Sequence, residues 1–262
     1  MIIVFFLCLF AHVSLLSAEM HNQPSDFVLV QQGTIPIILT APHGGSLKIP
    51  NVPVRKKATK GKDLNTFELT QALSKAIEEK TGEKPYIVAA HFKRVYIDAN
   101  RPADTAYEVS AAKPYYDYYH EQITKFVANI KQLFPNQNPL LIDIHGQGRE
   151  KDLVFRGTCD KQTVQQLLKS AGEDALTGPF SIAGVMSAQG IAVFPPISKP
   201  DQPEYASYIG GFTVRTYGSH TDLGINAIQL EFGSSYRNSE MIATTSQKVA
   251  QAIITFCERW QS

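Results

Sequence analysis

The sequence predicts an α/β domain. Short apolar runs alternate with amphipathic stretches along the chain, and several of the runs are bounded by glycine or proline. Of the 262 residues, 44% are hydrophobic and 19% are charged, which is an ordinary globular composition with enough apolar residues for a sizeable core. No linker and no internal repeat interrupts this pattern. We therefore expect residues 19–262 to form a single domain.

The charge balance argues against two classes of partner. The formal net charge is +1, so there is no electrostatic reason to expect binding to a nucleic acid or to an anionic membrane surface. We expect no nucleic acid among the partners of this protein.

The N-terminus differs from the rest of the chain. An almost unbroken apolar run over residues 2–16 is followed by Ser17 and Ala18, the pattern of a secretory signal peptide over residues 1–18. The alternative is an uncleaved membrane anchor, but a span needs about 20 apolar residues and this run is shorter. We expect a secreted protein with no stable membrane association after cleavage.

Three cysteines are present, and Cys8 lies in the predicted signal peptide. Secretion would permit a disulfide between Cys159 and Cys257. Two cysteines so far apart in sequence could equally stay free and buried. The sequence leaves both alternatives open.

The first half of the mature chain predicts four strands and one helix. Residues 27–33 and 35–42 are apolar runs that we expect to pair with each other. Residues 63–82 have apolar side chains close to helical spacing. Residues 85–92 and 94–100 are two further short apolar runs, which predict two more strands.

The second half continues the alternation and closes with an amphipathic helix. Between its predicted strands lies a loop, residues 195–211, punctuated by proline and glycine. The predicted elements are, in order, a helix over 115–134, a strand over 139–146, a helix over 160–172, a strand over 226–233 and a helix over 239–260.

Three of the predicted strands end in side chains that can carry chemistry. His43, His145 and Glu231 each stand at the carboxyl end of an apolar run, where open α/β sheets bind ligands. Two histidines and a carboxylate with an open fourth position form a common catalytic zinc shell. The alternative for His145 is a structural histidine that hydrogen-bonds a loop carbonyl, and we expect His91, His120 and His220 to be structural.

Five segments in order resemble motifs of one family. They are "APHGG", "DLNTFEL", "RVYIDANRP", "LLIDIHGQG" and "NAIQLEFGSSYR", spread over residues 36–237. Together they are similar to the motifs of the N-formylglutamate amidohydrolase family, which is related in fold to the zinc carboxypeptidases. The resemblance implies a three-layer α/β/α domain with a mixed, mostly parallel central sheet and a metal-dependent hydrolase site at the strand ends.

The resemblance also implies a set of metal ligands. His43 and His145 would bind Zn²⁺, and Asp63 matches the expected position of the third ligand, with Glu68 in reserve. The His-x-x-Glu of the carboxypeptidase relatives is absent, because Gly44, Gly45 and Ser46 follow His43. The alternative for Asp63 is an N-cap of the helix over 63–82.

Substrate and proton-transfer roles follow from the same resemblance. Asn100 and Arg101 match a pair that grips a substrate carboxylate, for which a guanidinium is well shaped. Glu231 matches the general base, although it could instead pair with Arg237. Arg94 and Arg237 could hold a second carboxylate or polarise the scissile carbonyl, or be ordinary ion-paired arginines.

These expectations combine into a function. We expect a secreted hydrolase that cleaves the amide of a small N-formyl or N-acyl amino acid, or a short peptide with a free carboxylate. A zinc-activated water would attack, with Glu231 as general base, and Tyr205 and Tyr208 of the loop over 195–211 could close over the substrate. The alternatives are a carboxypeptidase-like metallopeptidase, a cell-wall peptide amidase, and a non-catalytic secreted binding protein on the same fold.

Overall fold

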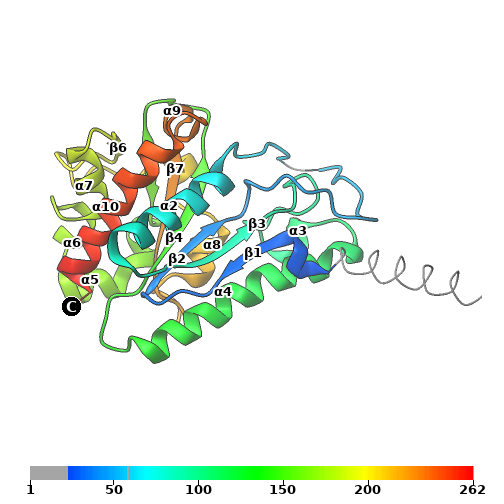
Figure 1. Cartoon of the computed structure of the whole chain (residues 1–262), viewed down its shortest axis with the longest axis horizontal. Coiled ribbons are helices and arrows are strands. Elements are labelled where there is room, and N and C mark those ends of the chain that lie inside the picture. The colour runs from blue at the N-terminus through cyan, green and yellow to red at the C-terminus, as the bar shows by residue number, and fades with distance from the viewer. Residues whose placement is uncertain (1–22, 58, 262) are drawn as a thin grey trace, which may run out of the picture.

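The computed structural model describes residues 23–57 and 59–261 (Figure 1). The predicted signal peptide lies outside these residues. Among the helices of the described part, none combines the length and the apolar character needed to cross a membrane. Cys159 and Cys257 are both free thiols, so of the two alternatives the structure supports the unbridged one.

A single mixed sheet runs through the molecule, in the strand order β1-β3-β2-β4-β7-β5-β6. The neighbours β3-β2, β2-β4, β4-β7 and β5-β6 are parallel, whereas β1-β3 and β7-β5 are antiparallel. The prediction of a mixed, mostly parallel sheet is therefore confirmed. The strands are β1 (Val28–Gln31), β2 (Ile37–Ala41), β3 (Tyr86–Ala90), β4 (Leu140–Gly146), β5 (Val154–Gly157), β6 (Val193–Phe194) and β7 (Asn226–Phe232).

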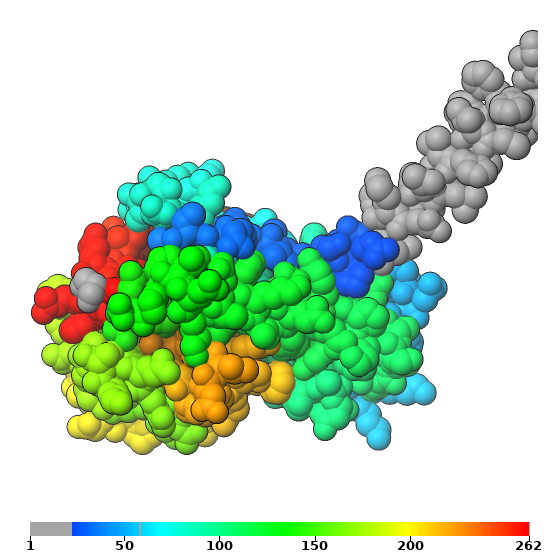
Figure 2. All heavy atoms as spheres, turned by 90° about the horizontal axis from the view of Figure 1, so that it is seen from below, coloured from blue at the N-terminus to red at the C-terminus, as the bar shows by residue number. Residues whose placement is uncertain are grey.

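Helices cover both faces of this sheet and complete the expected three layers (Figure 1). One face carries α2 (Thr66–Thr81), α7 (Ile182–Ala188) and α10 (Ile242–Trp260), and the other carries α4 (Lys113–Leu133) and α8 (Phe212–Tyr217). Seen from the α4 side, the residues of this helix, in green, spread across the face beside the orange segment that contains α8 (Figure 2).

The remaining helices are short and connect these layers. They are α3 (Ala103–Ala106), α5 (Gln165–Ala171), α6 (Asp174–Thr177) and α9 (Ser234–Arg237), with single 3-10 turns η1 (Pro24–Phe27), η2 (Ser110–Ala112), η3 (Gln162–Val164) and η4 (Ala206–Tyr208).

The central strands β2, β4 and β7 are buried on both faces. In β4, Ile142 and Ile144 face α2 and α10, whereas Leu141 faces α4, and all three are fully buried. Alternate residues of a strand point to opposite faces, so Asp143 and His145 share the α4 face with Leu141. The α4 face of β4 therefore ends in two polar side chains, whereas its other face is apolar.

The expected pairing of residues 27–33 with 35–42 was wrong. β1 instead pairs antiparallel with β3, and β2 lies between β3 and β4. Both edges of β2 are therefore occupied by parallel strands, which places this apolar run at the centre of the sheet. Adjacency in the chain was a poor guide here, because burial of β2 on both faces decides its neighbours.

The expected strand over residues 94–100 was also wrong. This segment is a turn, in which Oδ1 of Asp98 accepts a hydrogen bond from the backbone N–H of Asn100 at 3.1 Å and the Arg101 N–H bonds the Asp98 carbonyl at 3.2 Å. An aspartate that bonds the backbone two residues ahead stabilises a turn over a strand. Tyr96 and Ile97 are buried in the core beside α4, which accounts for the apolar run.

The helix expected over 63–82 begins at Thr66, and Asp63 is not its N-cap. That position belongs to Asn65, which has a left-handed backbone with φ 62° and no side-chain capping bond. The first turn is instead satisfied in part by the backbone carbonyl of Asp63, which accepts from the Thr66 N–H at 3.3 Å. Gly82, with φ 74°, ends the helix as expected. The Asp63 carboxylate is thereby left available for other contacts.

The remaining predicted elements agree with the structure in part. The helices expected over 115–134 and 239–260 correspond to α4 and α10, and the helix expected over 160–172 is divided into η3 and α5. The strands β5 and β6 and the helices α7 and α8 were not predicted. β5 has only four residues, too few to show a period.

Candidate metal and substrate site

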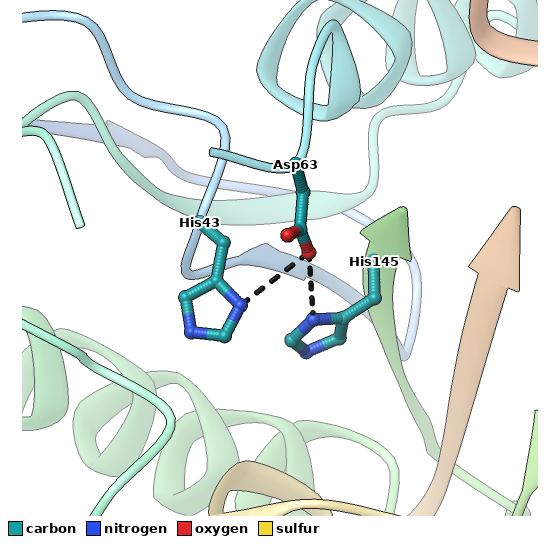
Figure 3. Close-up of side chains that lie close together, drawn as sticks. All are labelled: His43, Asp63 and His145. Atoms are coloured by element: carbon teal, nitrogen blue, oxygen red, sulfur yellow. Dashed lines mark hydrogen bonds and ion pairs between the residues drawn. The ribbon is translucent and has the colours of Figure 1, made fainter. Parts of the chain in front are cut away.

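Three side chains from distant parts of the chain meet at the carboxyl end of the parallel strands (Figure 3). His43 follows β2 by two residues, Asp63 lies in the loop before α2, and His145 stands near the end of β4. The turn that carries His43 lies tightly against α2, because a Cβ added to Gly44 would lie 2.4 Å from the Phe67 amide nitrogen. Only glycine allows this approach.

The three side chains are arranged as ligands of one ion would be. Oδ2 of Asp63 lies 3.1 Å from Nδ1 of His145 and 3.4 Å from Nδ1 of His43, and the three ligand atoms all lie within 4.8 Å of one another. Ligand atoms bound tetrahedrally to zinc at its usual distances are about 3.3 Å apart. All three residues are buried. The donor set and its spacing therefore fit a small divalent cation.

A carboxylate stands behind each imidazole. Nε2 of His43 lies 2.6 Å from Oδ1 of Asp98, and Nε2 of His145 lies 2.9 Å from Oδ2 of Asp143. When Nε2–H donates to such a carboxylate, the lone pair of Nδ1 points at the other ligands. Nδ1 of His43 is buried and makes no hydrogen bond with the described residues. A metal ion would satisfy this nitrogen.

The charges around the cluster favour a cation. Burial opposes charge on His145, but Asp143, Glu231 and Asp63 outweigh it and hold the pKa of this imidazole well above its usual value. Burial alone would raise the pKa of Asp63, yet its contacts with the imidazoles of His145 and His43 hold it well below its usual range. The carboxylates thus outnumber the positive groups in contact with them, which is the environment that a dication requires.

Glu231 lies directly beside the three candidate metal ligands. His145 of β4 and Glu231 of β7 are partners in the parallel register, so their side chains share one face of the sheet. Nε2 of Gln229 donates to Oε1 of Glu231 at 2.9 Å, and Oε1 of Gln229 accepts from the Gly211 N–H at 2.7 Å. Burial raises the pKa of Glu231, although His145 opposes the shift. Burial therefore favours the protonated form of this carboxylate.

A cavity of about 390 Å³ opens over these groups. Its lining includes Gln147 and Gly148 after β4, and Ser207 and Tyr208 of η4. Part of the loop over 195–211 therefore borders the site, while closure of that loop over a substrate stays a prediction. The volume suits a small molecule or the end of a peptide.

The three predicted polar residues of the segment 94–101 also line this cavity. Arg101 is exposed there, and its guanidinium makes no hydrogen bond or ion pair with the described residues. Arg94 pairs with Asp98 through Nη2 at 2.9 Å and Nε at 3.0 Å. Asn100 is buried, with Nδ2 3.1 Å from Nε2 of His145 and Oδ1 accepting from the Thr213 N–H at 2.7 Å.

Two predicted residues lie elsewhere. Glu68 is exposed on α2 and is not among the residues that line the cavity. Arg237 is buried behind the site, where its guanidinium donates to three backbone carbonyls, so it does not pair with Glu231. Burial lowers the pKa of Arg237, while Asp63 and Glu231 oppose the shift.

Sequence reasoning assigned no role to Asp98 and Asp143, the carboxylates that hold the two imidazoles. A signal for Asp143 was present, since it stands two residues before His145 and alternate residues of a strand share a face. Asp98 meets His43 across 55 residues of chain, and no local pattern shows this contact. The role of Gln229 in holding Glu231 follows from the same alternation along β7.

The fold and the cavity together define a class: three-layer α/β proteins in which side chains that could hold a metal ion lie at the carboxyl ends of the parallel strands. The sequence matches no protein-family model and no curated protein. Among solved structures, the N-formylglutamate amidohydrolase from Ralstonia eutropha JMP134 is similar at a TM-score of 0.60, with 16% identity over 88% of this chain and 97% of that one. A gene product of Agrobacterium tumefaciens is similar at a TM-score of 0.58, with 13% identity over 92% of this chain and 97% of that one.

These likenesses concern the fold. The resemblance drawn from the five sequence motifs is confirmed at that level, because the chain has the architecture of a solved N-formylglutamate amidohydrolase over most of the length of both chains.

Proposed function

We propose that this protein is a metal-dependent hydrolase of carbon–nitrogen bonds, acting on the amide of a small N-formyl or N-acyl amino acid or of a short peptide with a free carboxylate. The observation that carries the proposal is the content of one cavity. It brings together a buried group suited to a cation, a carboxylate beside that group and the unpaired guanidinium of Arg101. The fold, shared with an N-formylglutamate amidohydrolase, supports the same reaction class.

Zinc is the metal that these ligands suit best. Two imidazole nitrogens and one carboxylate oxygen, from His43, His145 and Asp63, are a frequent donor set of catalytic zinc. When bound, zinc supplies Lewis acidity, which polarises the amide carbonyl and lowers the pKa of a water.

The chain's own residues supply the remaining functions. Arg101 would bind the substrate carboxylate through two parallel hydrogen bonds and so place the scissile amide over the metal-ligating group. Glu231 would accept a proton from the attacking water and return it to the leaving amine. Gln229 holds the Glu231 carboxylate in place for both transfers. Arg94, which borders the cavity, would stabilise negative charge on the carbonyl oxygen.

The predicted signal peptide bears on the substrate. An exported enzyme would meet N-formyl or N-acyl peptides, or cell-wall fragments, outside the cell. A carboxypeptidase-like peptidase and a cell-wall amidase share the same chemistry and differ in the bond they cleave. Mass spectrometry of the products distinguishes the three activities. The proposed hydrolase releases an acyl acid, a carboxypeptidase releases a terminal amino acid, and a cell-wall amidase releases a peptide from the lactyl group of the cell-wall sugar.

The test begins with the metal. Purified mature protein should contain about one zinc per chain, and His43→Ala and His145→Ala should lose it while remaining folded. His220→Ala, which changes an exposed histidine, is the matched control and should keep the metal. The zinc-loaded protein is then incubated with N-formyl, N-acetyl and peptide derivatives of glutamate, aspartate and neutral amino acids, and the released amine is measured.

Two results would contradict the proposal. A protein that binds no zinc after reconstitution would exclude the hydrolase mechanism and favour a binding protein on this fold. A zinc-loaded protein that hydrolyses none of these amides would contradict the substrate class.

A further inference from the structure

We propose that Arg237 is a positioning residue, which fixes the relative placement of the three chain segments that carry Asp63, His145 and Glu231. The inference rests on the proposed function, since it concerns the geometry of that site. Arg237 belongs to the short helix α9, directly after β7, and only 9% of its surface is exposed.

The guanidinium donates to three carbonyls, each within two residues of a residue of the site. Nη1 bonds the carbonyl of Leu64, which follows Asp63, at 2.7 Å. Nε bonds the carbonyl of Phe232, which follows Glu231, at 3.1 Å. Nη2 bonds the carbonyl of Gln147, two residues after His145, at 3.1 Å.

These bonds extend the sheet beyond the ends of its strands. The last link between β4 and β7 is the hydrogen bond from the Gln147 N–H to the Phe232 carbonyl, at 3.0 Å. Arg237 bridges the carbonyls of the same two residues, so the strand ends that carry His145 and Glu231 cannot separate without breaking it. Its third bond attaches the Asp63 segment to this pair.

Two further contacts hold Arg237 itself. A Cβ added to Gly146 would lie 2.7 Å from Nε of Arg237, so the backbone directly after His145 rests on the guanidinium. Nδ2 of Asn65 donates to the carbonyl of Arg237 at 2.9 Å. His43 is joined to the same assembly, because its carbonyl accepts a hydrogen bond from the Asp63 N–H at 3.2 Å.

Arginine is the side chain that this position requires. A planar guanidinium presents donors in several fixed directions and can reach three separate carbonyls, whereas the ammonium of lysine is a single compact group. The side chain is not among those that line the cavity, which argues against direct contact with substrate. Its effect on the reaction would therefore pass through the metal-ligating residues and Glu231.

The experiment compares Arg237→Lys, Asn65→Gly and the control Arg156→Lys in the full mature chain. Arg156 is another buried arginine, bonded to the Leu176 carbonyl at 3.0 Å and facing Glu204, away from the cavity. Glycine at position 65 keeps the left-handed backbone and removes the contact to Arg237. For each variant, the zinc dissociation constant is measured by competition with a chromophoric chelator, and kcat and KM are measured on the substrate that wild type hydrolyses.

We expect Arg237→Lys to weaken zinc binding by at least tenfold and to lower kcat, with KM changed by less than threefold. Asn65→Gly should weaken zinc binding by a smaller factor. Arg156→Lys should lower the melting temperature and leave the zinc dissociation constant within twofold of wild type.

A folded Arg237→Lys with wild-type zinc affinity would overturn the proposal, and a tenfold rise in KM alone would instead assign this arginine to substrate binding. If Arg237→Lys does not fold, an unchanged zinc affinity in Asn65→Gly overturns it. The zinc measurement needs no substrate. If the wild type binds zinc but hydrolyses nothing, the proposed function is contradicted, but the role of Arg237 can still be tested by zinc affinity.

Discussion

Replacing Asp98 by asparagine should weaken zinc binding without removing any ligand. Oδ1 of this carboxylate lies 2.6 Å from Nε2 of His43, and Asp98 is only 1% exposed. Its other oxygen accepts from Arg94, through Nη2 at 2.9 Å and Nε at 3.0 Å. Both oxygens therefore act as acceptors, and an amide offers only one.

The expected loss of zinc affinity follows from this mismatch between two acceptors and one. If the asparagine oxygen stays on His43, the amide NH₂ faces the guanidinium of Arg94, and donor meets donor. If the amide flips, Nε2–H of His43 loses its acceptor. A lost hydrogen bond to a charged group costs about 1.5–3 kcal/mol, which is a factor of about 10 to 100 in affinity. The loss of a group that orients a metal-bound histidine typically falls in the same range.

The assay is a chelator competition that gives the zinc dissociation constant of Asp98→Asn and of wild type, with circular dichroism to confirm folding. Glu204→Gln serves as the matched control, because Glu204 is also a buried carboxylate, accepting from the Thr158 N–H at 2.7 Å, but touches neither histidine. A folded Asp98→Asn that binds zinc within twofold of wild type would refute the reasoning.

Three other outcomes are expected. Glu231→Gln should keep its zinc and lose at least 100-fold in kcat, as general-base catalysis is worth about 10²–10⁴, and a smaller loss in steady-state kinetics would exclude Glu231 as the base. Arg101→Met should raise KM about 10- to 100-fold for substrates with a free carboxylate and leave it unchanged for the corresponding amides, so equal effects on both would count against the carboxylate contact. Burial lowers the pKa of His120 from 6.5 to about 4, despite the Ala99 carbonyl and Asp143. Below pH 6.5 the unfolded chain therefore binds a proton that the folded chain does not, and the free energy of unfolding should fall by about 2–3 kcal/mol between pH 7 and 4.5. His120→Gln should flatten this dependence in urea titrations, and an unchanged slope would show that other groups cause it.

The part of this fold that the sequence predicts is the part with strong periodicity. β4 and β7 are long apolar runs, α4 and α10 are long amphipathic helices, and each appears close to its expected bounds. Pairing between strands is non-local, and the neighbours of β2 could not be derived from its own residues. The short elements β5, β6 and α8 are too brief to carry a period.

The sequence predicts some residues of the candidate site and misses others. His43, His145 and Glu231 stand at strand ends, so a parallel sheet brings them to one edge, and the structure brings Asp63 to the same place. The contact of Asp98 with His43 depends on how a turn packs against a distant loop, which no spacing rule predicts. Arginine is a suitable residue for binding a carboxylate, and only the structure shows that the guanidinium of Arg237 donates to three backbone carbonyls.

The candidate metal ligands are far apart in sequence, so a bound ion would also cross-link the chain. Asp63 and His145 are 82 residues apart in sequence, and an ion held by both would close that loop as a cross-link does. In the chain-entropy model a covalent link across such a loop would be worth about 4–5 kcal/mol. The two cysteines that the structure describes are unbridged, so zinc would be the only such tie within residues 23–57 and 59–261. The concentration of free zinc would then set the melting temperature of this protein as well as its activity.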